Sequence, residues 1–282
     1  STLVDFDDTV DGLIVDWAER WPQLSEAKLC PAIGDGAAAN IGSGCDTPDR
    51  IALTIGTTGA MRMVVDPTIA QVPDGLWLYR VNDERGLLGG ATTEGGSLFA
   101  WLSETLQLPP AAELEAELVQ RPPAAHGLTV LPFIGGERAP GWNEAARGTF
   151  SGVSMHTDAV DLVQASLESI AYRFALIHGR IKAHLPADSA QTIIASGGAL
   201  LQSPAWMQIM ADVLGQPVVA LEETELTSRG IALLALEALG VIERSSDLPP
   251  ATGKAYDPDP IRHDVHLEAL ARQVDLYERL YA

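Results

Sequence analysis

The sequence predicts an α/β fold in which helices flank a mixed β-sheet. Short β-rich runs separated by Gly, Pro and Asp occupy residues 51–91, and helical and strand patterns alternate from residue 157 onwards. Strands joined by short turns pair antiparallel, whereas strands separated by helices can pair in parallel. Because both kinds of connection occur in one chain, we expect a layered domain with one mixed sheet.

The first part of the chain is expected to be helical, and the next part to form strands. Residues 1–30 are an acidic helical lead-in to the same domain, with a helical pattern near Val10–Trp21 that ends at Pro22. The strands expected next are Ile51–Ile55, Ala60–Val65, Leu76–Val81 and Leu87–Ala91. A helix then begins after Gly95 and Gly96 and stops before Pro109.

The second part of the chain is expected to alternate helices and strands. The Pro-rich connection Arg121–Pro123 leads to the apolar run Leu128–Ile134. The longest helix starts at Thr157 or Asp158 as its N-cap, and its apolar residues recur every three or four positions, so one face must be buried. The remaining expected elements are a surface loop over Asp247–Asp259, strands Thr192–Ala195 and Val218–Leu221, and helices Pro204–Leu214, Ser228–Leu239 and Val265–Tyr281.

The composition excludes several classes of function. The 282 residues carry 18 Lys and Arg against 38 Asp and Glu, a formal net charge of −20, so binding to nucleic acid or anionic lipid is not expected. No apolar stretch approaches the ~20 residues of a transmembrane helix, and aspartates stand where a signal peptide would be basic. Cys30 and Cys45 lack CxxC spacing, so we expect buried thiols in the reducing cytoplasm, with neither a zinc site nor a disulfide.

Two short motifs have the form of phosphate-handling loops but lack the context that such loops need. Asp5–Thr9 has the DxDxT form of a phosphatase nucleophile loop, but no strand of useful length precedes it, so it is interpreted as a solvated helix start. Thr252–Lys254 lacks the opening glycine and the magnesium-binding hydroxyl of a P-loop. Since no HExxH or Gly-x-Ser-x-Gly motif occurs, zinc hydrolysis and serine acyl transfer have no support.

Four glycine-punctuated turns are the candidates for a ligand site. They lie within Ile33–Asn40, Thr54–Met61, Thr92–Trp101 and Ala195–Ser203. Each one alone is typical of an N-cap, a hairpin turn or a glycine with positive φ. Glycine turns before helices also direct backbone amides at phosphate groups. Four of them in one domain therefore favour an anion-binding nucleotide site.

A longer pattern resembles a signature of the FGGY carbohydrate kinases. Gly148-x-Phe150-x-Gly152-Val153 is followed, after seven residues, by Asp161-Leu162-x-x-Ala165-Ser166-Leu167-Glu168, which matches the second signature of that family at each constrained position. The segments Ile33–Gly44, Gly136–Gly148 and Ala195–Gly215 also stand in the family's order. The resemblance implies that residues 31–282 form the C-terminal, ATP-binding domain, with the actin-like ATPase (ribonuclease H-like) fold. It also implies phosphoryl transfer from MgATP to a sugar or polyol hydroxyl in a cleft between two domains.

The resemblance assigns roles to individual residues. The implied catalytic base and substrate-binding residues are Asp35 and Gly36; the implied nucleotide-binding residues are Thr57, Thr58, Gly96, Gly197, Gly198 and Gln202. No metal ligand is assigned to this chain, so Mg²⁺ is expected to arrive with ATP. Trp142 and Arg147 match an interdomain loop of the family, although Arg147 is equally typical of a buried structural ion pair.

The sequence also departs from the family's pattern. Nothing in it resembles the family's N-terminal half, which supplies the first phosphate loop, a magnesium-associated Asp and most sugar contacts. We therefore expect a sugar kinase half that is inactive without that partner domain, with gluconate as the first substrate hypothesis and a pentulose, xylulose or ribulose, as the second. A non-catalytic nucleotide-binding module and an actin-like assembly protein are the alternatives, and a homodimer remains open.

Overall fold

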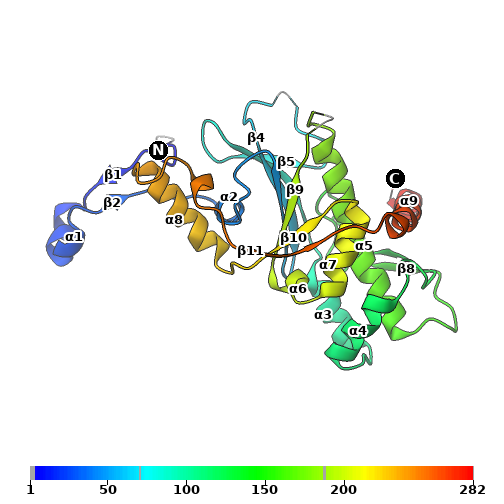
Figure 1. Ribbon diagram of the computed structural model, residues 1–282. Helices are drawn as coiled ribbons and strands as arrows, with labels where there is room; N and C mark the ends of the chain where they lie inside the picture. Colours follow the sequence, from blue (N-terminus) through cyan, green and yellow to red (C-terminus); the bar gives the residue numbers. More distant parts are fainter. Residues whose placement is uncertain (1–3, 70, 187–188, 282) are drawn as a thin grey trace.

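The centre of the molecule is a seven-stranded mixed sheet (Figure 1). The structure is a computed structural model and describes residues 4–69, 71–186 and 189–281. The strand order is β11-β10-β9-β3-β4-β6-β5, in which β10, β9 and β3 are parallel and the other neighbours are antiparallel. The strands are β3 (Arg50–Ile55), β4 (Gly59–Val65), β5 (Trp77–Arg80), β6 (Gly86–Thr92), β9 (Thr192–Ser196), β10 (Val218–Leu221) and β11 (Thr252–Tyr256). The expected mixed sheet is confirmed.

One face of the sheet carries the main hydrophobic core. Alternate residues of β3 and β4 pack there against helices α3 (Gly96–Thr105), α4 (Ala111–Gln120), α5 (Ala159–Lys182), α6 (Gly198–Leu201), α7 (Pro204–Leu214) and α9 (Pro260–Tyr281). The long helix α5 buries Val163, Ile170 and Phe174 against the sheet, as its apolar spacing predicts. Asp158 is its N-cap and forms a reciprocal capping box with Asp161, which decides between the two expected N-caps.

The opposite face is covered by a closely packed pair of helices, α2 (Asp35–Gly42) and α8 (Leu226–Ala238) (Figure 1). Their backbones meet at two glycines. A Cβ added at Gly42 would lie 1.9 Å from the Leu226 carbonyl oxygen, and one added at Gly230 would lie 1.8 Å from that of Ala38. This close approach fixes α2 against the molecule and so fixes the position of Asp35, its first residue.

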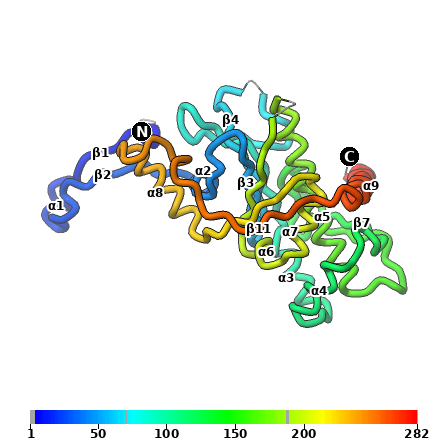
Figure 2. The backbone as a smooth tube through the Cα atoms, in the orientation of Figure 1, coloured from blue at the N-terminus to red at the C-terminus, as the bar shows by residue number. Residues whose placement is uncertain are grey.

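Residues 10–29 form an arm that projects from the body of the molecule (Figures 1 and 2). Strand β1 (Val10–Asp11) pairs with β2 (Lys28–Leu29), and between them lie α1 (Val15–Arg20), which buries no residue, and the short 3₁₀ helix η1 (Pro22–Leu24). The expected helix over Val10–Trp21 is therefore wrong at its start, because residues 10–11 pair as a strand. Asp5–Thr9 contains a turn and no helix start, and residues 1–3 of the expected lead-in lie outside the described residues.

Three further expectations need correction. The predicted loop Asp247–Asp259 contains edge strand β11, whose pairing with β10 depends on backbone groups and so leaves no apolar pattern in the sequence. Helix α9 begins at Pro260 rather than near Val265, because proline is compatible with the first turn of a helix. Cys45 is buried as expected, but Cys30 is exposed. Elements not predicted include α4, η2 (Ser245–Asp247), and strands β7 (Thr129–Leu131) and β8 (Thr149–Ser151).

Candidate active site

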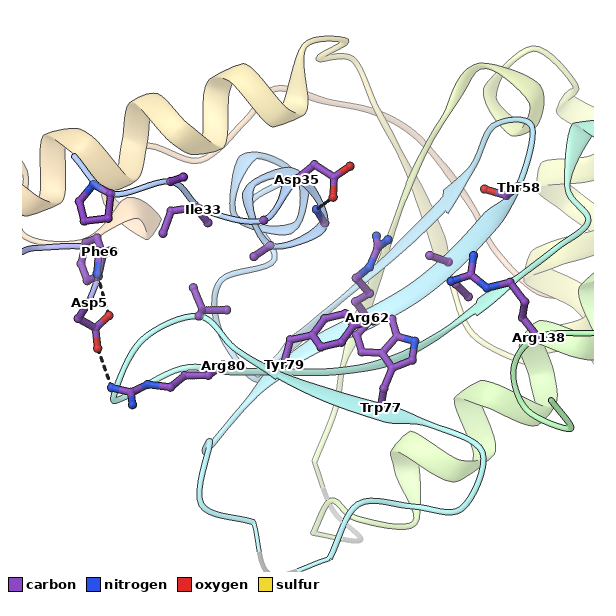
Figure 3. A pocket seen from close by; sticks show the side chains of 18 of the residues that line it. Asp5, Phe6, Ile33, Asp35, Thr58, Arg62, Trp77, Tyr79, Arg80 and Arg138 are labelled. Atoms are coloured by element: carbon purple, nitrogen blue, oxygen red, sulfur yellow. Dashed lines mark hydrogen bonds and ion pairs between the residues drawn. The ribbon is translucent and has the colours of Figure 1, made fainter. Parts of the chain in front are cut away.

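Asp35 faces a cavity of about 760 Å³ between the start of α2 and strands β4 and β5 (Figure 3). It is the first residue of α2, and its Oδ1 accepts a hydrogen bond of 2.6 Å from the Gly36 amide. The N-terminus of a helix carries partial positive charge, so a carboxylate is favoured there. Gly36 and Thr58 line the same cavity. The structure thus brings Asp35, Gly36 and Thr58, three of the predicted site residues, to one cavity.

Arginines and aromatic rings form the far wall of this cavity, and the sequence analysis missed them. Arg62, Arg80 and Arg138 line it, together with Trp77 and Tyr79, whose rings stack 4.2 Å apart (Figure 3). Arg80 donates to Asp5 Oδ2 at 2.8 Å. Within the described residues, the guanidinium groups of Arg62 and Arg138 take part in no hydrogen bond or ion pair. The detectable signal was an arginine at position 62 inside the otherwise apolar run Ala60–Val65.

The hairpin turn between β3 and β4 presents two hydroxyls next to a helix start. The Gly56 amide donates to the Thr58 carbonyl at 2.9 Å, and the side chains of Thr57 and Thr58 are exposed. The first residues of α3 bind this turn, since the Gly96 amide donates to the Gly56 carbonyl at 2.7 Å and the Ser97 amide to that of Thr57 at 3.1 Å. Two of the four glycine turns therefore form one continuous surface.

A second, mostly apolar cavity of about 340 Å³ lies at the start of α3. Gly96 and Gln202 line it, with Phe99, Leu167 and Trp206. Glu115 lies at its edge, where its carboxylate accepts hydrogen bonds from the Ser203 hydroxyl at 2.8 Å and the Ala205 amide at 2.6 Å. An apolar cavity with one amide side chain suits a heteroaromatic base, which needs apolar surface and a few polar contacts.

Gly197 and Gly198 form the turn into α6 and are not among the lining residues of this second cavity in the described part of the chain. Gly197 has φ 93°, and a Cβ there would lie 2.3 Å from the Ile55 carbonyl oxygen. Gly198 is the first residue of α6, and its nearest neighbour to an added Cβ is Gln202 Nε2 at 3.8 Å. The β9–α6 turn therefore needs glycine at 197 so that it can pack on the end of β3.

Glu94 lies in the segment that joins the two cavities. It is buried, and its Oε1 accepts a hydrogen bond of 2.8 Å from the Gly135 amide. Burial raises the pKa of Glu94 to about 7, although hydrogen bonds and the charge of Arg173 oppose that rise. Arg173 itself is buried and paired with Glu137.

The Gly148–Glu168 signature is mostly structural. Glu168 is buried on α5 and accepts hydrogen bonds from Gln164, Tyr172 and the Ala124 amide, and it also pairs with His126. Burial alone would raise the pKa of Glu168, but the His126 hydrogen bond and nearby histidine charges lower it overall. This network anchors residues 124–126, which directly follow the Pro-rich connection Arg121–Pro123.

The expected interdomain-loop residues are both exposed. Trp142 has φ 54° and donates from Nε1 to the Gly75 carbonyl at 2.8 Å. Arg147 donates to the carbonyls of Glu144 and Ala146, each at 2.8 Å, and forms no ion pair within the described residues. The interpretation of Arg147 as a buried ion-pair partner is therefore wrong.

The described residues contain neither a cluster of metal ligands nor a helix suited to cross a membrane. In residues 4–69, 71–186 and 189–281, no cluster of three or more His, Cys, Asp or Glu side chains is placed to hold a metal ion. The same residues contain no helix that is both long and apolar enough to cross a membrane.

Comparison with known proteins decides the family. Residues 51–239 match the profile of the C-terminal domain of the FGGY family of carbohydrate kinases. The chain belongs to this family. Among curated relatives, it is 29% identical to the gluconokinase of Bacillus subtilis over 80% of this chain and 46% of the relative, and 32% identical to the glycerol kinase of Rhizorhabdus wittichii over 81% and 46%.

Solved structures of this family share the fold. A xylulose kinase from Lactobacillus acidophilus matches with a TM-score of 0.87 at 25% identity, and a gluconate kinase from the same organism with 0.86 at 25%. Each comparison covers 99% of this chain and 57% of the other. The expected actin-like ATPase fold is therefore confirmed. The chain spans about half the length of the curated relatives it matches, and these relatives differ in their named substrates.

Proposed function

We propose that this chain is the ATP-binding half of a carbohydrate kinase in which Asp35 is the catalytic base. The observation that carries the proposal is the position of Asp35, at a helix N-terminus and facing a cavity that it shares with Thr58. Phosphoryl transfer needs chiefly a positioned hydroxyl and a stabilised phosphoryl group, because bond formation demands little covalent chemistry from the protein. A carboxylate that orients the attacking hydroxyl and accepts its proton meets the first need.

We assign the nucleotide to the apolar cavity and the adjoining turn. The adenine base packs against Phe99 and meets the Gln202 amide, and the phosphates pass over Thr57 and Thr58 towards Asp35. Mg²⁺, bound with ATP, supplies charge neutralisation on the phosphate oxygens. The two exposed threonine hydroxyls suit phosphate oxygens, so the residues present are compatible with MgATP.

The reaction at Asp35 is then an in-line substitution. The substrate hydroxyl oxygen forms a bond to the γ-phosphorus of ATP while the bond from that phosphorus to the β–γ bridging oxygen breaks and ADP leaves. The hydroxyl proton passes to an Asp35 carboxylate oxygen. The absence of a Cβ at Gly36 leaves room beside this carboxylate for the Arg62 guanidinium, which would be 3.5 Å from such an atom.

Gluconate is the substrate we propose first, supported by the similarity to gluconokinases at 29% and 28% identity. Xylulose or ribulose is the alternative, supported by the similarity to a xylulose kinase. We also propose that an N-terminal half, which the relatives' greater length accommodates, completes the substrate site. A nucleotide-binding module without kinase activity is the alternative of a different class.

The test is an ATP-dependent phosphorylation assay on the full-length protein with its N-terminal half. Gluconate, xylulose, ribulose and glycerol are compared, and Asp35→Asn is expected to lower kcat by about 10²–10⁴-fold on the preferred substrate. Asp16→Asn, on the exposed helix α1, is the matched control and should keep full activity. Absence of turnover with all four substrates, or an undiminished Asp35→Asn variant, contradicts the proposal.

A further inference from the structure

Arg62 is directed to the substrate side of the sheet by the register of β4. Met61 and Met63, its neighbours on the strand, lie in the main core on one face. Side chains alternate along a strand, so Arg62 must lie on the opposite face, where α2 and the Asp35 cavity are (Figure 3). It lies on an interior strand, paired on both sides, opposite Ala52 of β3 and Gly89 of β6.

The guanidinium of Arg62 rests against the backbone beside Asp35. A Cβ added at Gly36 would be 3.5 Å from Nη2 and 3.6 Å from both Cζ and Nε of Arg62. The side chain also lies over the Trp77 ring, with Cζ 5.9 Å from the ring centroid. Despite this proximity, Arg62 and Asp35 form no ion pair within the described residues. Arg62 is therefore held by packing and leaves its donors directed at the cavity.

The three arginines of the cavity differ in their exposure and in whether they already form an ion pair. Arg80 is already paired with Asp5, and Arg138 is exposed. Arg62 is half-buried and unpaired, and burial lowers its pKa, although the charge of Asp35 opposes that effect. A guanidinium with reduced hydration gains most from a planar anion that accepts two of its hydrogen bonds.

We propose that Arg62 recognises the carboxylate of a sugar-acid substrate and so makes this kinase select acids over neutral sugars and polyols. The inference rests on the proposed kinase function and deepens it by naming a specificity-determining residue. In this arrangement, the substrate carboxylate forms a bidentate pair with Arg62 while a hydroxyl along the same chain reaches Asp35. A neutral substrate leaves the guanidinium of Arg62 without a counter-charge, which disfavours its binding.

The transferred phosphoryl group is the other anion that could reach this cavity. Arg62 lies three residues along β4 from Gly59, where the Thr57–Thr58 turn ends, which places its Cα about 10 Å from the turn. In the close-up, Arg138 is the arginine nearer to Thr58, and Arg62 the one nearer to Asp35 (Figure 3). This placement favours Arg62 as a ligand of the substrate rather than of the nucleotide.

The experiment compares gluconate with glucitol, its neutral counterpart on the same carbon chain, in the full-length protein. Arg62→Met preserves the length and apolar stem of the side chain but removes its charge. We expect kcat/KM for gluconate to fall roughly 100-fold, mainly through KM, because a hydrogen-bonded charge pair is lost. In Arg62→Met, the KM for ATP and the turnover of glucitol should stay within about threefold of the parent values. The kcat/KM of Arg62→Lys for gluconate should lie between those of the parent and of Arg62→Met. Arg279→Met, which removes an exposed charge on α9, is the control.

Calorimetry with gluconate separates this inference from the proposed function. Asp35→Asn should still bind gluconate while losing turnover, whereas Arg62→Met should bind it at least tenfold more weakly than the parent protein. Equal losses on gluconate and glucitol, or a raised KM for ATP, would assign Arg62 to phosphoryl transfer and overturn the inference. A parent protein that prefers glucitol or a pentulose, or an Arg62→Met variant with unchanged gluconate affinity, overturns it as well. If turnover is absent throughout but gluconate binding depends on Arg62, only the proposed kinase activity fails.

Discussion

The apolar cavity that we assign to the nucleotide, here called the nucleotide cavity, and the Asp35 cavity differ in the charge of their walls. The nucleotide cavity, about 340 Å³, is lined mostly by apolar residues, several of which also belong to the main core. The lining of the Asp35 cavity, about 760 Å³, contains Asp35 and three arginines, two of them unpaired within the described residues, beside aromatic and aliphatic side chains. The nucleotide cavity is thus lined in part by the hydrophobic core, whereas the unpaired arginines near Asp35 can still pair with an anionic ligand.

The largest predicted effect concerns the support of the nucleotide cavity. Gly197→Ala should destabilise the protein by roughly 2–4 kcal/mol, because φ is 93° and the new Cβ would lie 2.3 Å from a carbonyl oxygen. Gly198→Ala is the matched control and should change stability by less than about 1 kcal/mol, since nothing lies within 3.8 Å of the new Cβ. Urea unfolding of both variants measures the difference. Equal stabilities would mean that the β9–α6 turn does not depend on its left-handed glycine.

The second prediction is a dependence of stability on pH that follows from the buried carboxyl of Glu94. The pKa of Glu94 is raised to about 7 in the folded state, from an ordinary value of 4.5. Well below pH 4.5, Glu94 is protonated in both the folded and the unfolded protein, so it costs the folded state nothing. As the pH rises from 4.5 to 7, Glu94 ionises in the unfolded protein first, and the free energy of unfolding falls. Glu94→Gln removes this loss and should be about 1–3 kcal/mol more stable than the parent at pH 8, with the gain vanishing near pH 4.

Glu168→Gln is the control, because its effect on stability should depend on pH in the opposite direction. The pKa of Glu168 is lowered in the folded state, so its stabilising contribution is present above its ordinary pKa and is lost as pH falls. This variant should therefore be less stable than the parent at pH 7, and the deficit should shrink in acid. Chemical denaturation across pH 4–8 measures both variants. A Glu94→Gln variant whose advantage is independent of pH contradicts the assigned cause.

Much of the fold could be predicted because its central elements have strong periodic patterns. Strands β3, β4, β9 and β10 and helices α5 and α7 were expected within about two residues of their observed bounds. Edge strand β11 and the β1–β2 arm were not, because both pair through backbone groups and carry polar or exposed side chains. Elements that bury one face need apolar residues at regular spacing, which the sequence shows, whereas edge strands that pair through backbone groups need no such spacing.

The candidate site divides in the same way. Asp35 and the turns at Gly56 and Gly96 were expected, because the residues of each turn are close in sequence and the family resemblance orders them. Arg62 was missed because its relation to Gly36 joins a strand and a helix that are separated along the chain. Its sequence signal, one cation in an apolar strand, becomes interpretable only when the register of β4 shows which face it occupies.

The smallest predicted effect tests whether the two cavities act separately. Calorimetry with MgATP should detect binding, and Gln202→Ala should weaken it about tenfold by removing the amide that lines the nucleotide cavity. Asp35→Asn should leave that affinity within about twofold, because Asp35 lines the other cavity and meets the nucleotide only where the phosphoryl group is transferred. A strong effect of Asp35→Asn with none of Gln202→Ala would reverse the assignment and place the nucleotide in the charged cavity. The expected pattern would instead confine adenine recognition to the apolar cavity and leave the charges around Asp35 for the acceptor.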